Sequence, residues 1–257
     1  MNQPVLKPLS DRNWGNIRLI ASDMDGTLTQ SEKFNSKLFE ILTKLAAAEI
    51  KVLITTGRSA GWVQAISTYL PVVGAMAENG GLLYWQDGVV PQLLTEVDIN
   101  KHRQQLARVF GLLQSKFSQL KESQDNRFRL TDWTFDVEGL SLDELKQIEY
   151  ICQSEGFGFT YSTIQCHIKP LHQDKAFGLS KIIPQYFPDL KPEQIVTVGD
   201  SPNDESLFDS QKFPVSVGVA NVLPYRDRLQ YLPAYVTNES EASGFYELAE
   251  LILNLKC

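Results

Sequence analysis

The sequence predicts an α/β fold in which a parallel sheet carries a second, smaller α+β unit. Short apolar runs alternate with helix-like periodicity in residues 17–94, and the same alternation resumes in residues 172–257. In residues 95–171 the alternation gives way to helices and paired extended runs. We therefore expect a Rossmann-like core domain that is split in sequence, with an α+β domain inserted at 95–171.

The composition is that of an ordinary globular chain. With 257 residues, 43% of them hydrophobic, the chain can bury the core of one or two domains. Its formal net charge of −7 disfavours a broad surface for nucleic acids or anionic membranes. Cys152, Cys166 and Cys257 form no CxxC pair, and an odd number is more typical of reduced thiols than of a disulfide framework. We expect a small-molecule partner, and neither nucleic acid nor membrane.

Residues 1–16 are expected to form a flexible tail before the first strand. This opening is too polar for a signal peptide, and no apolar run reaches the length of a transmembrane helix. We therefore expect a cytoplasmic protein.

The first strand begins at Ile17 and ends at two aspartates and a glycine. Asp23 and Asp25 stand two residues apart, and alternate residues of a strand project to the same side. Parallel α/β sheets bind ligands outside the carboxyl ends of their strands, so both carboxylates should face a site. Taken alone, the run DMDGT could also be a polar turn after a buried strand, which is the less favoured reading.

A helix over residues 36–48 and a strand over 51–55 complete the first βαβ unit. This second strand ends in Thr56 and Gly57. A hydroxyl and glycine amides at a strand end could cradle an oxyanion, whereas an ordinary helix cap by Ser59 explains the same residues as well.

A second helix at about 60–70 precedes a third short strand over 71–76, which is followed by the glycine-rich run AENGG. Residues 82–94 then have the pattern of a hairpin that turns at 86–88. These glycines could serve the turns alone.

The insertion begins with a long amphipathic helix over about 98–120. Residues 127–137 are expected to be extended, and a change in the parity of their apolar positions predicts a bulge or a tight turn. A second helix over 142–155 precedes two extended runs, 157–161 and 164–168, with another change of parity between them. Helix, paired strands, helix, paired strands is the pattern of a small α+β layer.

From residue 174 the core pattern returns, with a helix over 175–186 and a strand over 194–198. The run GDSPND at 199–204 follows that strand and leads into a helix. Two more short strands and a closing helix over 241–255 complete the chain.

Charged and polar residues of complementary kinds thus converge at the strand ends. Mg²⁺ prefers carboxylates, waters and phosphate oxygens, while a lysine and a hydroxyl can hold the remaining phosphate charge. This set of side chains is sufficient for phosphoryl transfer. Its members are Asp23, Asp25, Thr56, Lys175, Asp200 and Asp204.

In chain order, DMDGT, TTGR, the lysine of DKAFGL and GDSPND resemble the four motifs of the haloacid dehalogenase (HAD) superfamily. The insertion between the second and third motifs is similar to a type IIB cap, which sucrose-phosphate, trehalose-phosphate and mannosyl-phosphoglycerate phosphatases share. The chain also resembles archaeal-type phosphoglycolate phosphatases. That resemblance depends on AENGGLLY, on NRFR leading to FDV, on EGFGFTYS before His167, and on DKAFGL before GDSPND.

The resemblance implies a catalytic role for two aspartates. Asp23 would attack phosphorus and form an aspartyl-phosphate, and Asp25 would act as general acid and then as general base. Mg²⁺ would be held by Asp23, by the backbone carbonyl of Asp25 and by Asp200.

The resemblance also implies a phosphate-binding set. Thr56, the amide of Gly57, Lys175 and Asn203 would bind phosphoryl oxygens. Asp204 would orient Lys175 or the waters of the metal.

Four residues outside these roles are candidates for substrate specificity: Arg58, Asn79, Arg129 and His167. An arginine fork suits a substrate carboxylate. The plain alternatives are a salt bridge at a helix start, a turn residue, a solvated strand arginine and a hydrogen-bonded histidine.

We expect a Mg²⁺-dependent phosphomonoester hydrolase, a monomer or homodimer, that acts on a small phosphorylated metabolite, with phosphoglycolate first and a sugar phosphate second. One alternative is a phosphotransferase or phosphomutase that passes the phosphoryl group to a sugar hydroxyl. Another is a non-catalytic sensor of a phosphorylated ligand.

Overall fold

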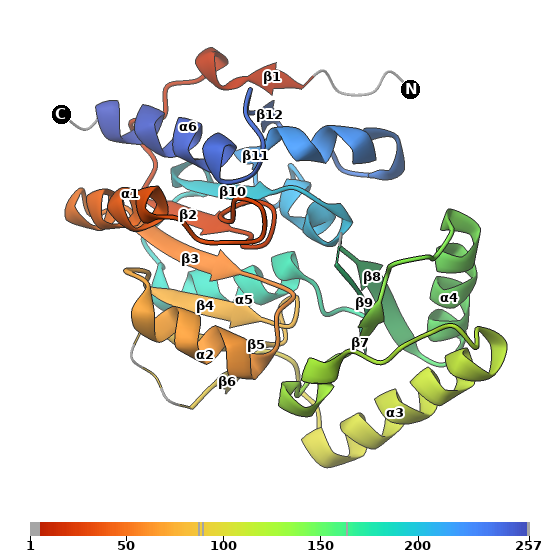
Figure 1. Ribbon diagram of the computed structural model, residues 1–257. Helices are drawn as coiled ribbons and strands as arrows, with labels where there is room; N and C mark the ends of the chain where they lie inside the picture. Colours follow the sequence, from red (N-terminus) through yellow and green to blue (C-terminus); the bar gives the residue numbers. More distant parts are fainter. Residues whose placement is uncertain (1–5, 87, 89, 163, 256–257) are drawn as a thin grey trace.

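The computed structural model describes residues 6–86, 88, 90–162 and 164–255, and its largest feature is a nine-stranded sheet (Figure 1). The strands are β1 (Lys7–Pro8), β2 (Leu19–Ser22), β3 (Lys51–Thr55), β4 (Gly74–Ala77), β5 (Leu82–Trp85), β6 (Gln92–Leu93), β10 (Ile195–Gly199), β11 (Ser216–Gly218) and β12 (Tyr235–Val236). Their order is β1-β12-β11-β10-β2-β3-β4-β5-β6. All neighbouring pairs from β1 to β4 are parallel, and β5 and β6 join as an antiparallel edge.

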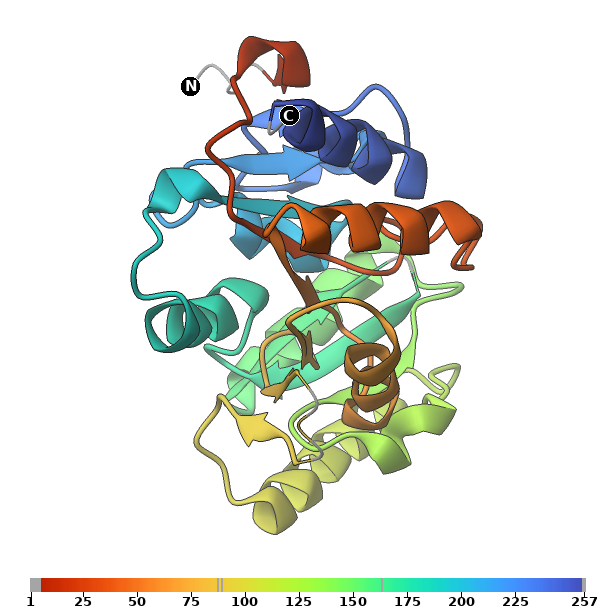
Figure 2. The same ribbon diagram turned by 90° about the vertical axis from the view of Figure 1, so that its left-hand side faces the viewer.

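Helices cover both faces of this sheet, which is why its central strands are mostly apolar and buried. Figure 2 shows α1 (Ser36–Ala47), α2 (Ala60–Tyr69) and α6 (Glu241–Asn254) on one side and α5 (Lys175–Tyr186) on the other. Alternate residues of β2 serve the two cores. Ile20 packs in the cluster that contains Phe245, whereas Ala21 packs in the cluster that contains Leu179. The predicted α/β core is confirmed.

The insertion forms a second, three-stranded antiparallel sheet, which we call the cap together with its two helices. The sheet has the order β7-β9-β8. The elements are α3 (Ile99–Lys116), β7 (Trp133–Asp136), α4 (Leu142–Ser154), β8 (Phe157–Tyr161) and β9 (Gln165–Pro170). Apolar residues of one sheet face, such as Phe135 and Cys166, pack with both helices, while Thr134 and His167 alternate with them. The cap lies on the side toward which β3 and β4 run (Figure 1).

The first of the two predicted strand pairs in the cap is wrong, because residues 127–137 contribute a single strand. Residues Gln124–Phe128 form a short 3₁₀ helix, η2, and the strand begins only at Trp133. The side chain of Asn126 pairs with this strand, beside the backbone of residues 121–123. Its Oδ1 accepts the N–H of Thr134 at 2.9 Å, and its Nδ2 donates to the carbonyl of Thr134 at 2.7 Å.

The predicted flexible tail is also wrong for residues 7–16, while residues 1–5 lie outside the described part of the chain. Strand β1 pairs with β12, and the ring of Trp14 is buried edge-on against Tyr235, with ring centroids 5.2 Å apart. The indole N–H of Trp14 donates to the carbonyl of Leu9 at 2.8 Å. An apolar ring with a satisfied polar tip holds this segment on the sheet.

The remaining elements differ little from expectation. The helix after Asp200 is a 3₁₀ helix, η4 (Pro202–Phe208). The hairpin of β5 and β6 is confirmed, although Asp87 of its predicted turn lies outside the described residues. Among the residues described, no helix combines the length and the apolar character needed to cross a bilayer.

Candidate active site

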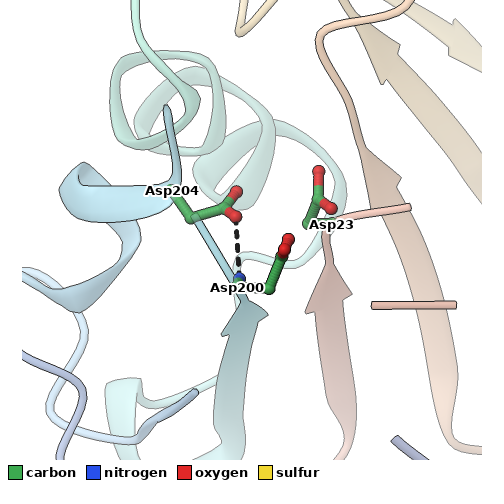
Figure 3. Close-up of side chains that lie close together, drawn as sticks. All are labelled: Asp23, Asp200 and Asp204. Carbon is green, nitrogen blue, oxygen red and sulfur yellow. Dashed lines mark hydrogen bonds between the residues drawn. The ribbon is translucent and has the colours of Figure 1, made fainter. Parts of the chain in front are cut away.

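The adjacent strands β2 and β10 deliver acidic side chains to one point. The N–H of Asp23 donates to the carbonyl of Val198 at 2.9 Å, so the chain continues the parallel register beyond β2. Figure 3 shows Asp23 and Asp200 at the tips of the two strands. Asp204 folds back from η4, and its Oδ2 accepts the N–H groups of Asp200 at 2.9 Å and Ser201 at 3.2 Å. Oxygens of the carboxylates of Asp23, Asp200 and Asp204 lie within 4.8 Å of one another.

One buried cation faces this cluster. Lys175 is the first residue of α5, and its Nζ donates to Asp23 Oδ1 and, at 2.5 Å, to Asp204 Oδ1. Burial, followed by repulsion from Asp204, raises the pKa of Asp23 to about 7. Burial and the charge of Asp23 raise the pKa of Asp200 well above its ordinary value. Burial opposes the charge of Lys175, but the two carboxylates outweigh it and raise the pKa of that ammonium.

The donor set fits a hard divalent cation such as Mg²⁺. Among the described residues, three buried carboxylates face a single ammonium, which leaves an excess of negative charge in a region of low dielectric. The carbonyl of Asp25 accepts no hydrogen bond from the described residues and is free to ligate. Asn221, which sequence reasoning missed, orients Asp200 by donating to its Oδ2 at 2.8 Å and to the carbonyl of Gly26 at 3.0 Å.

Gly26 is required for the close approach of these two segments. Its φ is +82°, and a Cβ at this position would lie 2.5 Å from Asp200 Oδ2. The glycine of the DMDGT run therefore serves the contact between the acidic strand ends.

The loop after β3 supplies a hydroxyl and an arginine. Thr56 Oγ1 accepts the N–H of Arg58 at 3.1 Å. The guanidinium of Arg58 holds both oxygens of Asp25, at 2.9 and 2.6 Å, and lies over the ring of Trp62 at 4.9 Å. A fork of this kind fixes the orientation of the Asp25 carboxylate.

A cavity lies in front of these groups, between the core and the cap. The cap contributes Ser162, Ile164, Gln165 and His167 to its wall. The residues of the core that line it are Asp23, Asp25, Thr56, Gly57, Arg58, Ser201 and Asn203.

His167 is presented to this cavity by a buried carboxylate. Its Nδ1 lies 2.8 Å from Asp132 Oδ2, and burial lowers the pKa of the imidazole although Asp132 acts in the opposite sense. A neutral ring that donates from Nδ1 to Asp132 carries its lone pair on Nε2. The ring lies against Gly57, where a Cβ would be 3.0 Å from His167 Cε1.

The other predicted residues lie behind the cavity wall. Lys175, Asp200 and Asp204 form the buried cluster, and Asn79 accepts from Asn203 Nδ2 at 3.1 Å. Arg129 is 2% exposed and does not line the cavity. Sequence reasoning also missed Asp132 and Gln165, because their spacing to the motifs follows no pattern. It used Glu78 only as part of the run AENGG and gave it no role.

Comparison with known proteins places this geometry in context. Residues 16–249 match the family model described as sucrose-6F-phosphate phosphohydrolase. A phosphoglycolate phosphatase of Thermoplasma acidophilum is 28% identical over 194 residues, which cover 75% of this chain and 81% of that protein.

Solved structures show the same fold. A crystal structure of Thermoplasma acidophilum 0175 superposes with a TM-score of 0.73 at 23% identity, covering 91% of this chain and 99% of that one. A sugar phosphatase of HAD subclass IIB superposes with a TM-score of 0.62 at 15% identity, covering 86% and 93% of the two chains. The split parallel core and the inserted cap are therefore shared with proteins of that subclass.

Proposed function

The chain belongs to the sucrose-6F-phosphate phosphohydrolase family of HAD-type phosphatases, and on that basis we propose that it hydrolyses a small phosphomonoester through an aspartyl-phosphate, with Mg²⁺. The observation that carries this proposal is the buried cluster in which Asp23 is paired with Lys175 beside Asp200 and Asp204. A carboxylate at a strand end, open to a cavity on one side and held by an ammonium on the other, is an oriented nucleophile.

In the first half-reaction a carboxylate oxygen of Asp23 attacks phosphorus, and the bond from phosphorus to the leaving oxygen breaks. Asp25 enters this step protonated, which requires Arg58 to release one of its oxygens, and it gives its proton to the departing alkoxide. Lys175 keeps Asp23 oriented through Oδ1, which leaves Oδ2 for the attack. Thr56 and the amide of Gly57 face the same cavity and would bind the phosphoryl oxygens as charge moves onto them.

In the second half-reaction Asp25 takes a proton from water, the hydroxide oxygen bonds to phosphorus, and the bond from phosphorus to Asp23 breaks. Phosphate leaves and the carboxylate of Asp23 is restored. Mg²⁺, held by Asp23, Asp200 and the carbonyl of Asp25, would supply Lewis-acid stabilisation of the phosphoryl charge.

The relatives support a small substrate. Curated relatives are named phosphoglycolate phosphatase, so we propose phosphoglycolate first and a sugar phosphate second.

The test is a panel of phosphorylated metabolites assayed for kcat/KM with Mg²⁺, with and without a chelator. Asp23→Asn should abolish turnover of every substrate, whereas Asp189→Asn, an exposed control, should leave it unchanged. Oxygen-18 from labelled water should appear in the released phosphate. Turnover in Asp23→Asn would refute the mechanism, and a clear preference for hexose phosphates would refute the first substrate.

A further inference from the structure

Arg129 of the cap uses every N–H group of its guanidinium within the described residues. A guanidinium has five N–H donors. Nε and Nη2 donate to Asp125 at 3.3 and 2.9 Å, and Nη2 also donates to Gln165 Oε1 at 3.0 Å. Nη1 donates to Asp132 at 2.9 Å and to the carbonyl of Gly57 at 2.9 Å. No donor is left for the carboxylate of a substrate.

The contact to Gly57 reaches the loop of residues 56–58, which lines the cavity and is proposed to bind the phosphoryl group. Each of the three backbone carbonyls of this loop accepts a hydrogen bond. The carbonyl of Thr56 accepts the N–H of Asn79 at 3.0 Å, and that of Arg58 accepts the N–H of Glu78 at 3.0 Å. Asn79 and Glu78 belong to the core, so Arg129 is the residue of the inserted domain that holds a carbonyl of this loop.

Fixing the carbonyl of Gly57 also fixes the N–H of Arg58, because the two groups share one planar peptide unit. That N–H donates to Thr56 Oγ1 at 3.1 Å. Because Oγ1 of Thr56 already accepts the N–H of Arg58, the hydroxyl proton of Thr56 must point away from Arg58. Thr56 lines the cavity, so the proton is available to a ligand there. Arg129 therefore acts on the Thr56 hydroxyl through one peptide plane.

The segment that carries Arg129 is clasped to the core. Glu78 is fully buried, and its carboxylate accepts the backbone N–H groups of Leu130 at 3.0 Å, Thr131 at 2.6 Å and Asp132 at 3.3 Å. Glu78 itself has a left-handed φ of +53°, a costly conformation for this residue type. The strained turn places the carboxylate where the cap segment must dock.

We propose that Arg129 is a positioning residue for the phosphate-binding loop, residues 56–58. Docking of residues 129–132 on the core would then complete the site for the phosphoryl group. The inference rests on the proposed function, since it concerns the same loop. It predicts that a cap residue controls binding of phosphate alone, whatever the organic part of the substrate.

The experiment compares Arg129→Lys and Arg129→Gln with Arg127→Gln, an exposed arginine of the short helix η2 that Arg129 directly follows. Binding of inorganic phosphate with Mg²⁺ is measured by calorimetry and by the amide resonances of Gly57 and Arg58. Both Arg129 variants should weaken phosphate about tenfold or more, as expected when a charge-assisted hydrogen bond is lost. The two amide resonances should shift before phosphate is added, and Arg127→Gln should match the parent chain.

Turnover then separates positioning from substrate recognition. The kcat/KM values for phosphoglycolate and for methyl phosphate, which lacks a carboxylate, should fall by the same factor. Unchanged phosphate binding, with a loss confined to phosphoglycolate, would overturn the inference. If Arg129→Gln does not fold, Arg129→Lys decides alone, because it keeps a charge beside Asp125 and Asp132. Since phosphate binding needs no turnover, the inference can fail or hold independently of the proposed hydrolysis.

Discussion

Replacing Asp200 by asparagine should stabilise the metal-free protein while abolishing its response to Mg²⁺. Asp200 is 1% exposed and lies with Asp23 and Asp204 in a cluster that has a single ammonium. An asparagine keeps one oxygen for the hydrogen bond that Asn221 donates at 2.8 Å. At a pH where Asp200 is ionised, the substitution removes a charge from a repulsive cluster and leaves the local packing nearly unchanged.

The size of the effect follows from the distances. Two carboxylates up to 4.8 Å apart repel each other by about 3 kcal/mol at an effective dielectric constant of about 20. Loss of the attraction between Asp200 and Lys175 offsets part of this gain. Without metal, we expect the free energy of unfolding to rise by about 1–3 kcal/mol. Each kcal/mol should raise the melting temperature by about 2–4 °C.

The pH dependence of the free energy of unfolding tests the predicted stabilisation by Asp200→Asn a second time. A carboxyl whose pKa is higher in the folded chain stabilises the fold at low pH and loses that contribution as the pH rises through the interval. For Asp23 the interval runs from 3.8 to about 7, which corresponds to about 4 kcal/mol at about 1.4 kcal/mol per pH unit. Because the pKa of Asp200 is raised in the same direction, the advantage of the variant should widen from pH 5 to pH 9.

Urea unfolding in a chelator and again in Mg²⁺ is the assay. The parent chain should gain about 2.7 kcal/mol at a hundredfold excess over the dissociation constant, and the variant should gain almost nothing. Asp189→Asn serves as the exposed control. A variant that is less stable than the parent in chelator, or equal stabilisation of both by Mg²⁺, would refute the electrostatic account.

Three further substitutions test neighbouring parts of the site. Lys175→Met should destabilise the metal-free protein by about 3 kcal/mol in urea unfolding and lower kcat at least a hundredfold, because it leaves buried carboxylates unpaired; unchanged stability would contradict this. Gly57→Ala would place a Cβ 3.0 Å from His167 Cε1 and should raise KM about tenfold. Adding His167→Ala to the same chain should partly restore KM, and a double variant with no lower KM would contradict the steric explanation. Glu78→Gln should cost about 3 kcal/mol in the free energy of unfolding, since an amide nitrogen cannot accept the N–H groups of the cap segment, while exposed Glu149→Gln should cost nothing measurable.

Much of the core fold could be predicted because buried parallel strands have a simple pattern. Strands such as β3 and β10 are mostly apolar runs, and helices such as α1 repeat apolar residues every three or four positions. The missed features depend on single side chains. The side chain of Asn126 pairs with the backbone of Thr134, and Trp14 holds the amino-terminal segment, and neither contact produces a periodic signal.

The candidate site shows the same division. Asp23 and Asp200 could be placed together because strand ends of a parallel sheet converge. The partners of Arg129 could not, since Gly57 and Gln165 lie far from it in sequence and on different elements. Whether an arginine is free to bind a substrate depends on how many of its donors the fold already uses, and that number follows only from tertiary contacts.

The taper of the large sheet has a consequence for how copies of the chain meet. Its central strands, such as β3 and β10, have five residues, whereas the outermost strands β1 and β6 have two each. An edge strand offers unpaired N–H and C=O groups to any other chain, and long flat edges are templates for aggregation. Two residues at each margin give an incoming strand very little to pair with. A nine-stranded sheet built in this way resists edge-to-edge association through its shape alone.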